Sequence, residues 1–148
     1  IQFGSLNDRP VAADYDGDGR ADLAVYRAGL WIILQSRDSS VRIQQFGLTS
    51  DKTVPGDYDG DGKSDIAVYR GGVWYIFQSK TGSVRVENFG LATDTPQPGD
   101  YDGDGKTDIA VFRQSNTKWY VIQSSNRLYR EVEFGMTGDI PVSSVYQY

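Results

Sequence analysis

The chain has 148 residues, enough for one domain with a substantial core, and its formal net charge is −5. It has no cysteine, which excludes disulfides and thiolate metal sites, and no histidine, which excludes Ser-His-Asp and Cys-His catalysis and the commonest zinc ligand. No apolar run approaches the roughly 20 residues of a membrane-spanning helix. The fifteen Lys and Arg are scattered without the stripe expected of a nucleic-acid-binding surface.

The sequence repeats itself with a period of about 43 residues. The motif DYDGDGRADLAVYR at 14–27 recurs as DYDGDGKSDIAVYR at 57–70 and as DYDGDGKTDIAVFR at 100–113. Internal repetition of this kind is typical of proteins built from one supersecondary unit. We therefore predict a single repeat domain over 1–148, with the following approximate units: 1–42, 43–85, 86–130 and a partial fourth at 131–148.

Each unit is predicted to form four short β-strands. In the second unit these are expected at the following ranges: 53–58, 65–70, 73–79 and 84–89. The strand runs are rich in Val, Ile, Tyr and Trp and are split by glycine turns such as Gly71-Gly72, which is the signature of β-hairpins. Aromatic residues make up 13 % of the chain and no segment keeps a helical period, so the predicted fold class is all-β.

The two ends of the chain differ in how they interrupt the repeat. The partial fourth unit keeps Asp139 and Pro141, but residues 145–148 read VYQY where the acidic motif would stand. We expect a genuine C-terminus here, with a strand over 142–148 that pairs with another strand. The N-terminus begins inside a unit at Ile1, and we expect it to be a cut.

The loop from Asp57 to Asp65 gathers four carboxylates, at loop positions 1, 3, 5 and 9. Calcium takes six to eight oxygen ligands, and alternate carboxylates in a tight loop supply them. Gly62 permits a sharp turn at position 6, and the carbonyl of Lys63 at position 7 can face inward. An EF-hand loop shares this first half but closes with Glu at position 12 between helices, whereas position 12 here is Val68 in a strand sequence. The loop is thus predicted to bind Ca²⁺ without being an EF-hand.

The alternative is that these loops are solvated acidic turns. Two unit charges about 4 Å apart repel by ~1 kcal/mol in bulk water and ~4 kcal/mol at an effective dielectric of 20. The three loops hold twelve of the twenty acidic residues, and three divalent cations would change the net charge from −5 to +1. This concentration of charge favours a bound cation, and Mg²⁺ fits less well because it prefers water ligands and rigid octahedral geometry.

The segment DYDGDGKSDIAVYR followed by VWYIFQS resembles the FG-GAP/VCBS-type repeats of bacterial surface and secreted proteins. These are similar to the calcium-binding blades of integrin alpha chains and of some fungal lectins. The resemblance extends over essentially the whole chain and implies β-propeller blades of four antiparallel strands, with about three Ca²⁺ per chain in the loops joining the first two strands. The implied carboxylate ligands are Asp14, Asp16, Asp18, Asp22, Asp57, Asp59, Asp61, Asp65, Asp100, Asp102, Asp104 and Asp108. The implied carbonyl ligands are those of Arg20, Lys63 and Lys106.

The number of units departs from the family pattern. Integrin-type rings have seven blades, whereas this chain has three and a fragment. A β-trefoil, which is also built from three four-stranded units, is the alternative architecture. If the units are blades, the open edges of an incomplete ring favour association. We then expect a homo-oligomer or a part of a larger ring.

Two further residue types recur once per unit. The tryptophans are Trp31, Trp74 and Trp119. Their fixed place in the repeat favours packing between units over stacking on sugar rings. The arginines that end the second strand are Arg27, Arg70 and Arg113. Pairing with a recurrent acid such as Asp51 or Asp94 is favoured for them over contacts with an anion or a sugar.

These observations favour a calcium-stabilised, non-enzymatic β-propeller module for binding or display. Extracellular calcium is high enough for such sites, so the expected location is outside the cell, in a secreted or cell-surface protein. Two alternatives remain: a lectin with carbohydrate sites between repeats, and an accessory module of a larger secreted hydrolase whose catalytic residues lie upstream of Ile1. The expected partner is a protein or a carbohydrate, with no nucleic acid and no membrane span.

Overall fold

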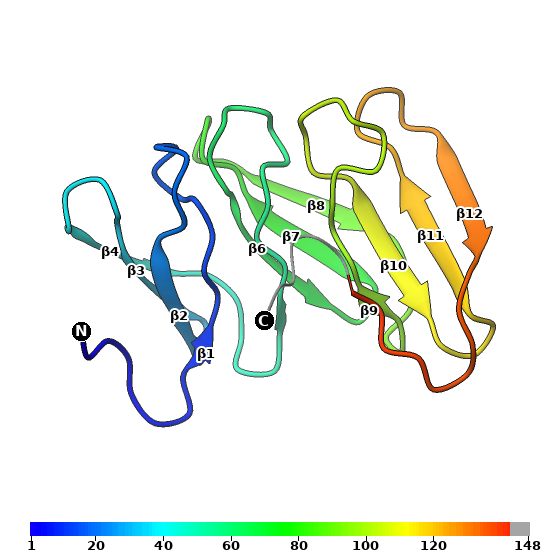
Figure 1. The fold of residues 1–148 in the computed structure, drawn as a ribbon, viewed down its shortest axis with the longest axis horizontal. Helices are drawn as coiled ribbons and strands as arrows, with labels where there is room; N and C mark the ends of the chain where they lie inside the picture. Colours follow the sequence, from blue (N-terminus) through cyan, green and yellow to red (C-terminus); the bar gives the residue numbers. More distant parts are fainter. Residues whose placement is uncertain (143–148) are drawn as a thin grey trace.

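The computed structural model describes residues 1–142 as three antiparallel four-stranded sheets that stand side by side (Figure 1). Sheet 1 consists of β1 (Arg9–Pro10), β2 (Leu23–Arg27), β3 (Leu30–Leu34) and β4 (Val41–Gln45). Sheet 2 consists of β5 (Lys52–Thr53), β6 (Ile66–Arg70), β7 (Val73–Phe77) and β8 (Val84–Asn88). Sheet 3 consists of β9 (Thr95–Pro96), β10 (Ile109–Arg113), β11 (Lys118–Ile122) and β12 (Tyr129–Glu133). The all-β prediction, with four antiparallel strands in each of the three full units, is confirmed.

Each sheet keeps its strands in the order of the sequence, from a two-residue first strand to an outer fourth strand. Within residues 1–142 the sheets close into no barrel and no helix is present, so this part of the chain gives no support to the trefoil alternative. Equally, none of the described residues forms a helix that could cross a bilayer.

The predicted hairpin turn in the second unit is confirmed. Gly71 and Gly72 join β6 to β7 with φ angles of 59° and 88°. A two-residue turn with both central residues in the left-handed region matches the twist of the strands it connects. The last three strands of this unit lie where they were predicted, shortened by one or two residues at their ends.

The prediction for the first strand of the second unit, at 53–58, is wrong, because β5 covers only Lys52–Thr53. The carbonyl of Val54 accepts a hydrogen bond from the Tyr58 hydroxyl at 2.7 Å, although the Val54 N–H still donates to the Ala67 carbonyl at 2.9 Å. The ladder is therefore interrupted after β5 and resumes only as the isolated bridge of Gly56 with Asp65.

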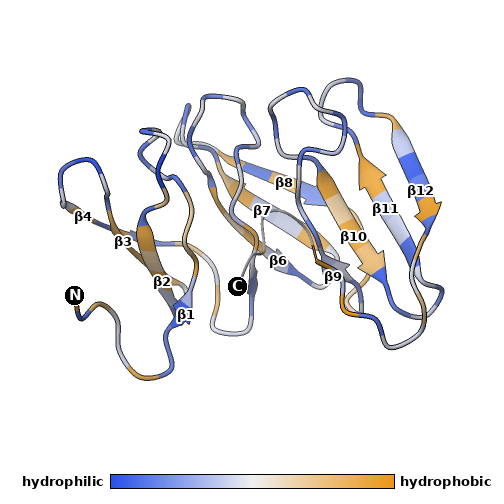
Figure 2. Cartoon of the chain, in the orientation of Figure 1, coloured by the Kyte–Doolittle hydropathy of each residue, from blue (hydrophilic) through white to orange (hydrophobic). Residues whose placement is uncertain are grey.

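The hydrophobic core lies between neighbouring sheets, and the apolar residues concentrate in the two middle strands of each sheet (Figure 2). At junction 1, between sheets 1 and 2, Trp31 and Ile33 pack with Ile66 and Val68. At junction 2, between sheets 2 and 3, the corresponding residues are Trp74, Ile76, Ile109 and Val111. Trp31 and Trp74 are fully buried, which confirms that these two tryptophans pack between units.

Sheet 3 presents the same kind of face, but no fourth sheet covers it among the described residues. Trp119 is partly exposed and donates its indole N–H to the carbonyl of Phe134 at 3.2 Å. With Val132 it lines an apolar hollow of about 240 Å³. The strand expected over 142–148 lies almost entirely outside the described residues, and Val142 itself is exposed and belongs to no strand.

Candidate metal centres

The three acidic loops lie along one edge of the row of sheets, where each connects the first strand of a sheet to the second (Figure 1). Loop positions 1 to 9 denote the following residues: 14–22, 57–65 and 100–108. The base of each loop is closed by an isolated antiparallel bridge to position 9: Ala13 with Asp22, Gly56 with Asp65, and Gly99 with Asp108. The same turn is thereby held three times in the same relation to its sheet.

The carboxylate of the aspartate at position 1 organises the loop by accepting hydrogen bonds from backbone N–H groups of later loop residues. In the second loop, the Asp57 carboxylate accepts the N–H groups of Gly60 at 2.7 Å, Asp61 at 3.1 Å and Gly62 at 2.9 Å. Gly60 and Gly62 have φ angles of 76° and 86°, a conformation that glycine adopts without the steric cost of a side chain. The glycines at positions 4 and 6 therefore let the chain curl around the first carboxylate.

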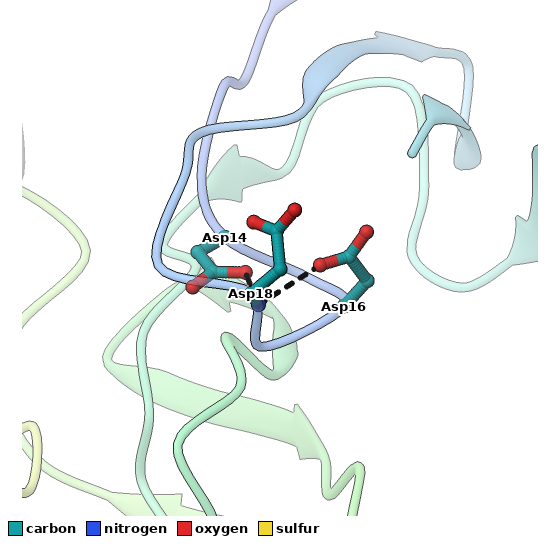
Figure 3. Close-up of side chains that lie close together, drawn as sticks. All are labelled: Asp14, Asp16 and Asp18. Carbon is teal, nitrogen blue, oxygen red and sulfur yellow. Dashed lines mark hydrogen bonds between the residues drawn. The ribbon is translucent and has the colours of Figure 1, made fainter. Parts of the chain in front are cut away.

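Three carboxylates converge in each loop. Figure 3 shows Asp14, Asp16 and Asp18 turned toward one another in the first loop, where each offers an oxygen within 4.8 Å of the others. The corresponding groups are Asp57, Asp59 and Asp61 in the second loop, and Asp100, Asp102 and Asp108 in the third. Positions 1 and 3 thus converge in all three loops, joined by position 5 in two of them and by position 9 in the third.

The aspartate at position 9 is fully buried and tied to the backbone in every loop. Asp65 accepts the N–H of Tyr58 at 2.9 Å on one oxygen and the N–H of Ser79 at 2.7 Å on the other. Burial raises the pKa of Asp65 to about 6, against the opposing effect of these N–H donors and of the Ser79 hydroxyl. This carboxylate connects the acidic loop to the turn between the third and fourth strands, in addition to any role as a ligand.

Serines that the sequence analysis did not single out also contact the cluster. In the second loop Ser79 donates its hydroxyl to Asp61 at 2.9 Å, and Lys80 donates its N–H to Asp59 at 3.0 Å. The equivalent hydroxyl donors are Ser36 to Asp18 and Ser124 to Asp104. The recurrent Gln-Ser pair at the end of the third strand was the available sequence signal (Gln35-Ser36, Gln78-Ser79, Gln123-Ser124).

The donor set fits a hard cation. All the converging atoms are carboxylate oxygens, the ligand type that Ca²⁺ prefers. With Ca–O distances of roughly 2.3–2.6 Å, two ligands on opposite sides of the ion are about 5 Å apart, so oxygens within 4.8 Å of one another can share one ion. The carbonyls of Arg20, Lys63 and Lys106 belong to residues whose N–H groups already donate to the position-5 aspartates.

Neighbouring loops are joined across the junctions. Ser64 donates its N–H to the carbonyl of Asp14 at 2.7 Å, and Thr107 does the same to Asp57 at 2.7 Å. The Lys63 side chain also lies against the first loop, because a Cβ placed on Gly17 would come within 2.9 Å of its Cγ. The edge that carries the loops is therefore one continuous, hydrogen-bonded surface.

By fold and donor chemistry, the chain is a β-repeat protein in which an acidic loop that could hold a metal ion connects the first two strands of each four-stranded sheet. Residues 57–111 match the model of the FG-GAP-like repeat family, from the second acidic loop through most of β10. The match is limited to this segment, and it confirms the predicted resemblance to FG-GAP-type repeats. Comparison with curated proteins and with solved structures gave no match.

Proposed function

We propose that this chain is a calcium-stabilised, non-enzymatic module of an extracellular protein, built for binding or display. The observation that carries the proposal is the convergence of carboxylate oxygens to within 4.8 Å of one another in each acidic loop. Without a counter-ion, such clusters oppose loop closure by charge repulsion. A cation at each loop would remove this repulsion and fix the turn between two strands.

The location outside the cell is supported by the family. FG-GAP-like repeats usually occur in extracellular proteins, and residues 57–111 match that family. Loops of this kind in extracellular modules bind calcium with Kd of roughly 10⁻⁴–10⁻³ M, so they need the calcium concentration found outside cells.

The absence of an enzymatic role is proposed from residue chemistry. The chain has no histidine or cysteine to act as base or nucleophile. Its concentrated carboxylates are engaged by backbone N–H groups in the loops, as the contacts of Asp57 and Asp65 illustrate.

The test of this proposal is isothermal titration of the metal-free protein with CaCl₂. We expect about three sites per chain, one for each acidic loop. A titration that shows one site or none would contradict the proposal, and a parallel titration with MgCl₂ should show much weaker binding.

We further propose that the three sheets are blades of a β-propeller whose open faces are covered by a second copy of the chain. At junctions 1 and 2 the tryptophan face of one sheet packs on the second strand of the next. The tryptophan face of sheet 3 carries the partly exposed Trp119, and the opposite face of sheet 1 carries Leu23, which is 48 % exposed. Leu23 stands where Ile66 and Ile109 are buried in the following sheets. In a second copy, sheet 1 can pack on sheet 3 of the first copy in the same way as sheets 2 and 3 pack at junctions 1 and 2. This contact would bury both exposed faces.

A further inference from the structure

A polar pocket of about 330 Å³ opens at junction 1, beside the first acidic loop. Three cationic side chains line it, Arg37, Arg42 and Lys63, together with two acids, Asp16 and Asp38. The lining therefore carries an excess of one positive charge. The remaining lining residues are Tyr15, Gln35, Phe77 and Ser79.

Arg42 lies on the inner face of the outer strand and faces sheet 2. It pairs across β3 with Ile33, which is fully buried in junction 1. Its side chain is half-buried, and among the described residues it makes no ion pair and no hydrogen bond. A half-buried guanidinium without a counter-ion is unfavourable, because its charge is partly withdrawn from water.

Junction 2 shows what the same position looks like with a counter-ion. Arg85 occupies the place of Arg42 on the equivalent strand, and it forms an ion pair with Glu87, whose side chain is 15 % exposed. The Glu87 carboxylate also accepts hydrogen bonds from both terminal nitrogens of Arg127, with N···O distances of 3.0 and 2.8 Å. In sheet 1, the position of Glu87 is taken by Gln44. Junction 1 therefore keeps the arginine, as Arg42, but lacks a carboxylate equivalent to that of Glu87.

We propose that the pocket at junction 1 binds a small carboxylate-bearing ligand, whose carboxylate pairs with Arg42 in the place that the Glu87 carboxylate takes at junction 2. Arginine recognises a carboxylate through paired N–H donors, which gives both affinity and orientation. This inference rests on the proposed role of the chain as a binding module, because it names the chemistry of a ligand.

The rest of the pocket favours a polar ring over an extended chain. Its volume is large enough for one monosaccharide, and Gln35, Asp38 and Ser79 line it with groups that exchange hydrogen bonds with hydroxyls. Phe77 offers an aromatic surface, whereas Ile122 stands in its place in sheet 3. A sugar acid such as a uronate combines the carboxylate with such a ring.

The probe is methyl β-D-glucuronide, titrated into the full chain at saturating calcium and followed by NMR shifts of residues around Arg42 and Phe77. We expect binding with Kd of roughly 1 mM, and no comparable binding of the uncharged methyl β-D-glucoside. Acetate serves as a bare carboxylate, and weaker binding of acetate supports the contribution of the ring. Equal binding of the glucoside and the glucuronide, or no binding of either, would overturn the proposal.

The decisive variant is Gln44→Glu, which gives sheet 1 the glutamate that sheet 2 has at the equivalent position, Glu87. The new carboxylate should form an ion pair with Arg42, compete with the ligand's carboxylate and weaken glucuronide binding about tenfold or more. The matched control is Gln45→Glu, which adds the same charge to the neighbouring exposed residue on the other face of β4 and should leave the affinity within about twofold. An unchanged affinity in Gln44→Glu would overturn the assignment of Arg42 as the anchor.

The outcome is separable from that of the calcium proposal. Calcium stoichiometry and melting in chelator report on the acidic loops, whereas glucuronide affinity at fixed saturating calcium reports on the pocket. A protein that binds about three calcium ions but no glucuronide would remove this inference and leave the proposed function standing.

Discussion

Arg70 donates from Nε and Nη2 to the two carboxylate oxygens of Asp51, each at 2.6 Å, and the Asp51 side chain is fully buried. The same carboxylate accepts the N–H of Leu48 at 2.8 Å, so the pair fastens the segment between sheets 1 and 2 onto β6. The predicted pairing of the recurrent arginine with a recurrent acid is confirmed, and it occurs again as Arg27 with Asp8 and as Arg113 with Asp94.

Replacing Arg70 with Met should lower the free energy of unfolding by about 2–3 kcal/mol. Removing one partner of a buried pair typically costs about 3–5 kcal/mol because the other charge is left unpaired, and the 38 % exposure of Arg70 reduces this figure. Urea denaturation at neutral pH measures the change. The double variant Arg70→Met with Asp51→Asn should recover part of the loss, and a double variant as unstable as the sum of the two single variants would contradict this account.

The pair of Asp8 and Arg27 predicts a dependence of stability on pH. Hydrogen bonds from Arg27, assisted by the N–H of Ser5, lower the pKa of Asp8 from 3.8 to about 2. Because the folded state holds this carboxylate ionised more strongly than the unfolded state, its contribution is complete above about pH 4 and disappears as the pH falls through 2. Asp8→Asn should therefore melt lower than the wild type at pH 6, and the difference should shrink steadily between pH 4 and pH 2. A difference independent of pH would contradict the ionic origin.

The hairpin turn of sheet 1 carries a strain that sheet 2 avoids. Ala28 has a φ of 50°, in the left-handed region, whereas its counterpart Gly71 meets the same requirement without a side chain. The left-handed conformation costs a residue with a side chain about 1–2 kcal/mol, part of which is offset by the greater freedom of glycine in the unfolded chain. Ala28→Gly should thus stabilise the protein by about 0.5–1 kcal/mol in urea denaturation. The reverse change, Gly71→Ala, should destabilise it by a similar amount, and effects of the same sign in both variants would refute the explanation.

The repeats made the acidic loops predictable from the sequence, but not the contacts that these loops make with other parts of each sheet. The alternating Asp and Gly residues fix the loop, so the convergence of Asp57 and Asp59 could be anticipated. The short β5 could not, because it depends on the Tyr58 hydroxyl turning back to the Val54 carbonyl, a tertiary detail that strand propensity does not contain. Ser79 was missed for a similar reason, since it lies in another turn and reaches the loop only through the folding of the sheet.

The open faces of sheets 1 and 3 predict that the protein associates. Sedimentation at high micromolar concentration with calcium should give a mass above the 16.4 kDa of one chain. Leu23→Lys places a charge on the exposed face of sheet 1 and should return the protein to a monomer. Val84→Lys is the control, because Val84 is similarly exposed but belongs to sheet 2, whose junctions are already formed within the chain. A wild-type monomer, or equal effects of both variants, would contradict the proposed contact.

Calcium should stabilise the folded chain, and the sign of a single substitution can show this. Binding to the native state alone contributes RT ln(1 + [L]/Kd), about 1.4 kcal/mol per site at tenfold excess and about 4 kcal/mol for three independent sites. Asp61→Asn keeps the shape of the side chain but removes one charge from the second cluster. In calcium it should therefore melt below the wild type, because that site binds more weakly. In EDTA it should melt at or above the wild type, because the same charge then only repels Asp57 and Asp59. Glu133→Gln, an exposed acid on β12 outside the loops, should show no such reversal. Identical melting of the wild type in calcium and in EDTA would mean that the loops are acidic turns held by their own hydrogen bonds.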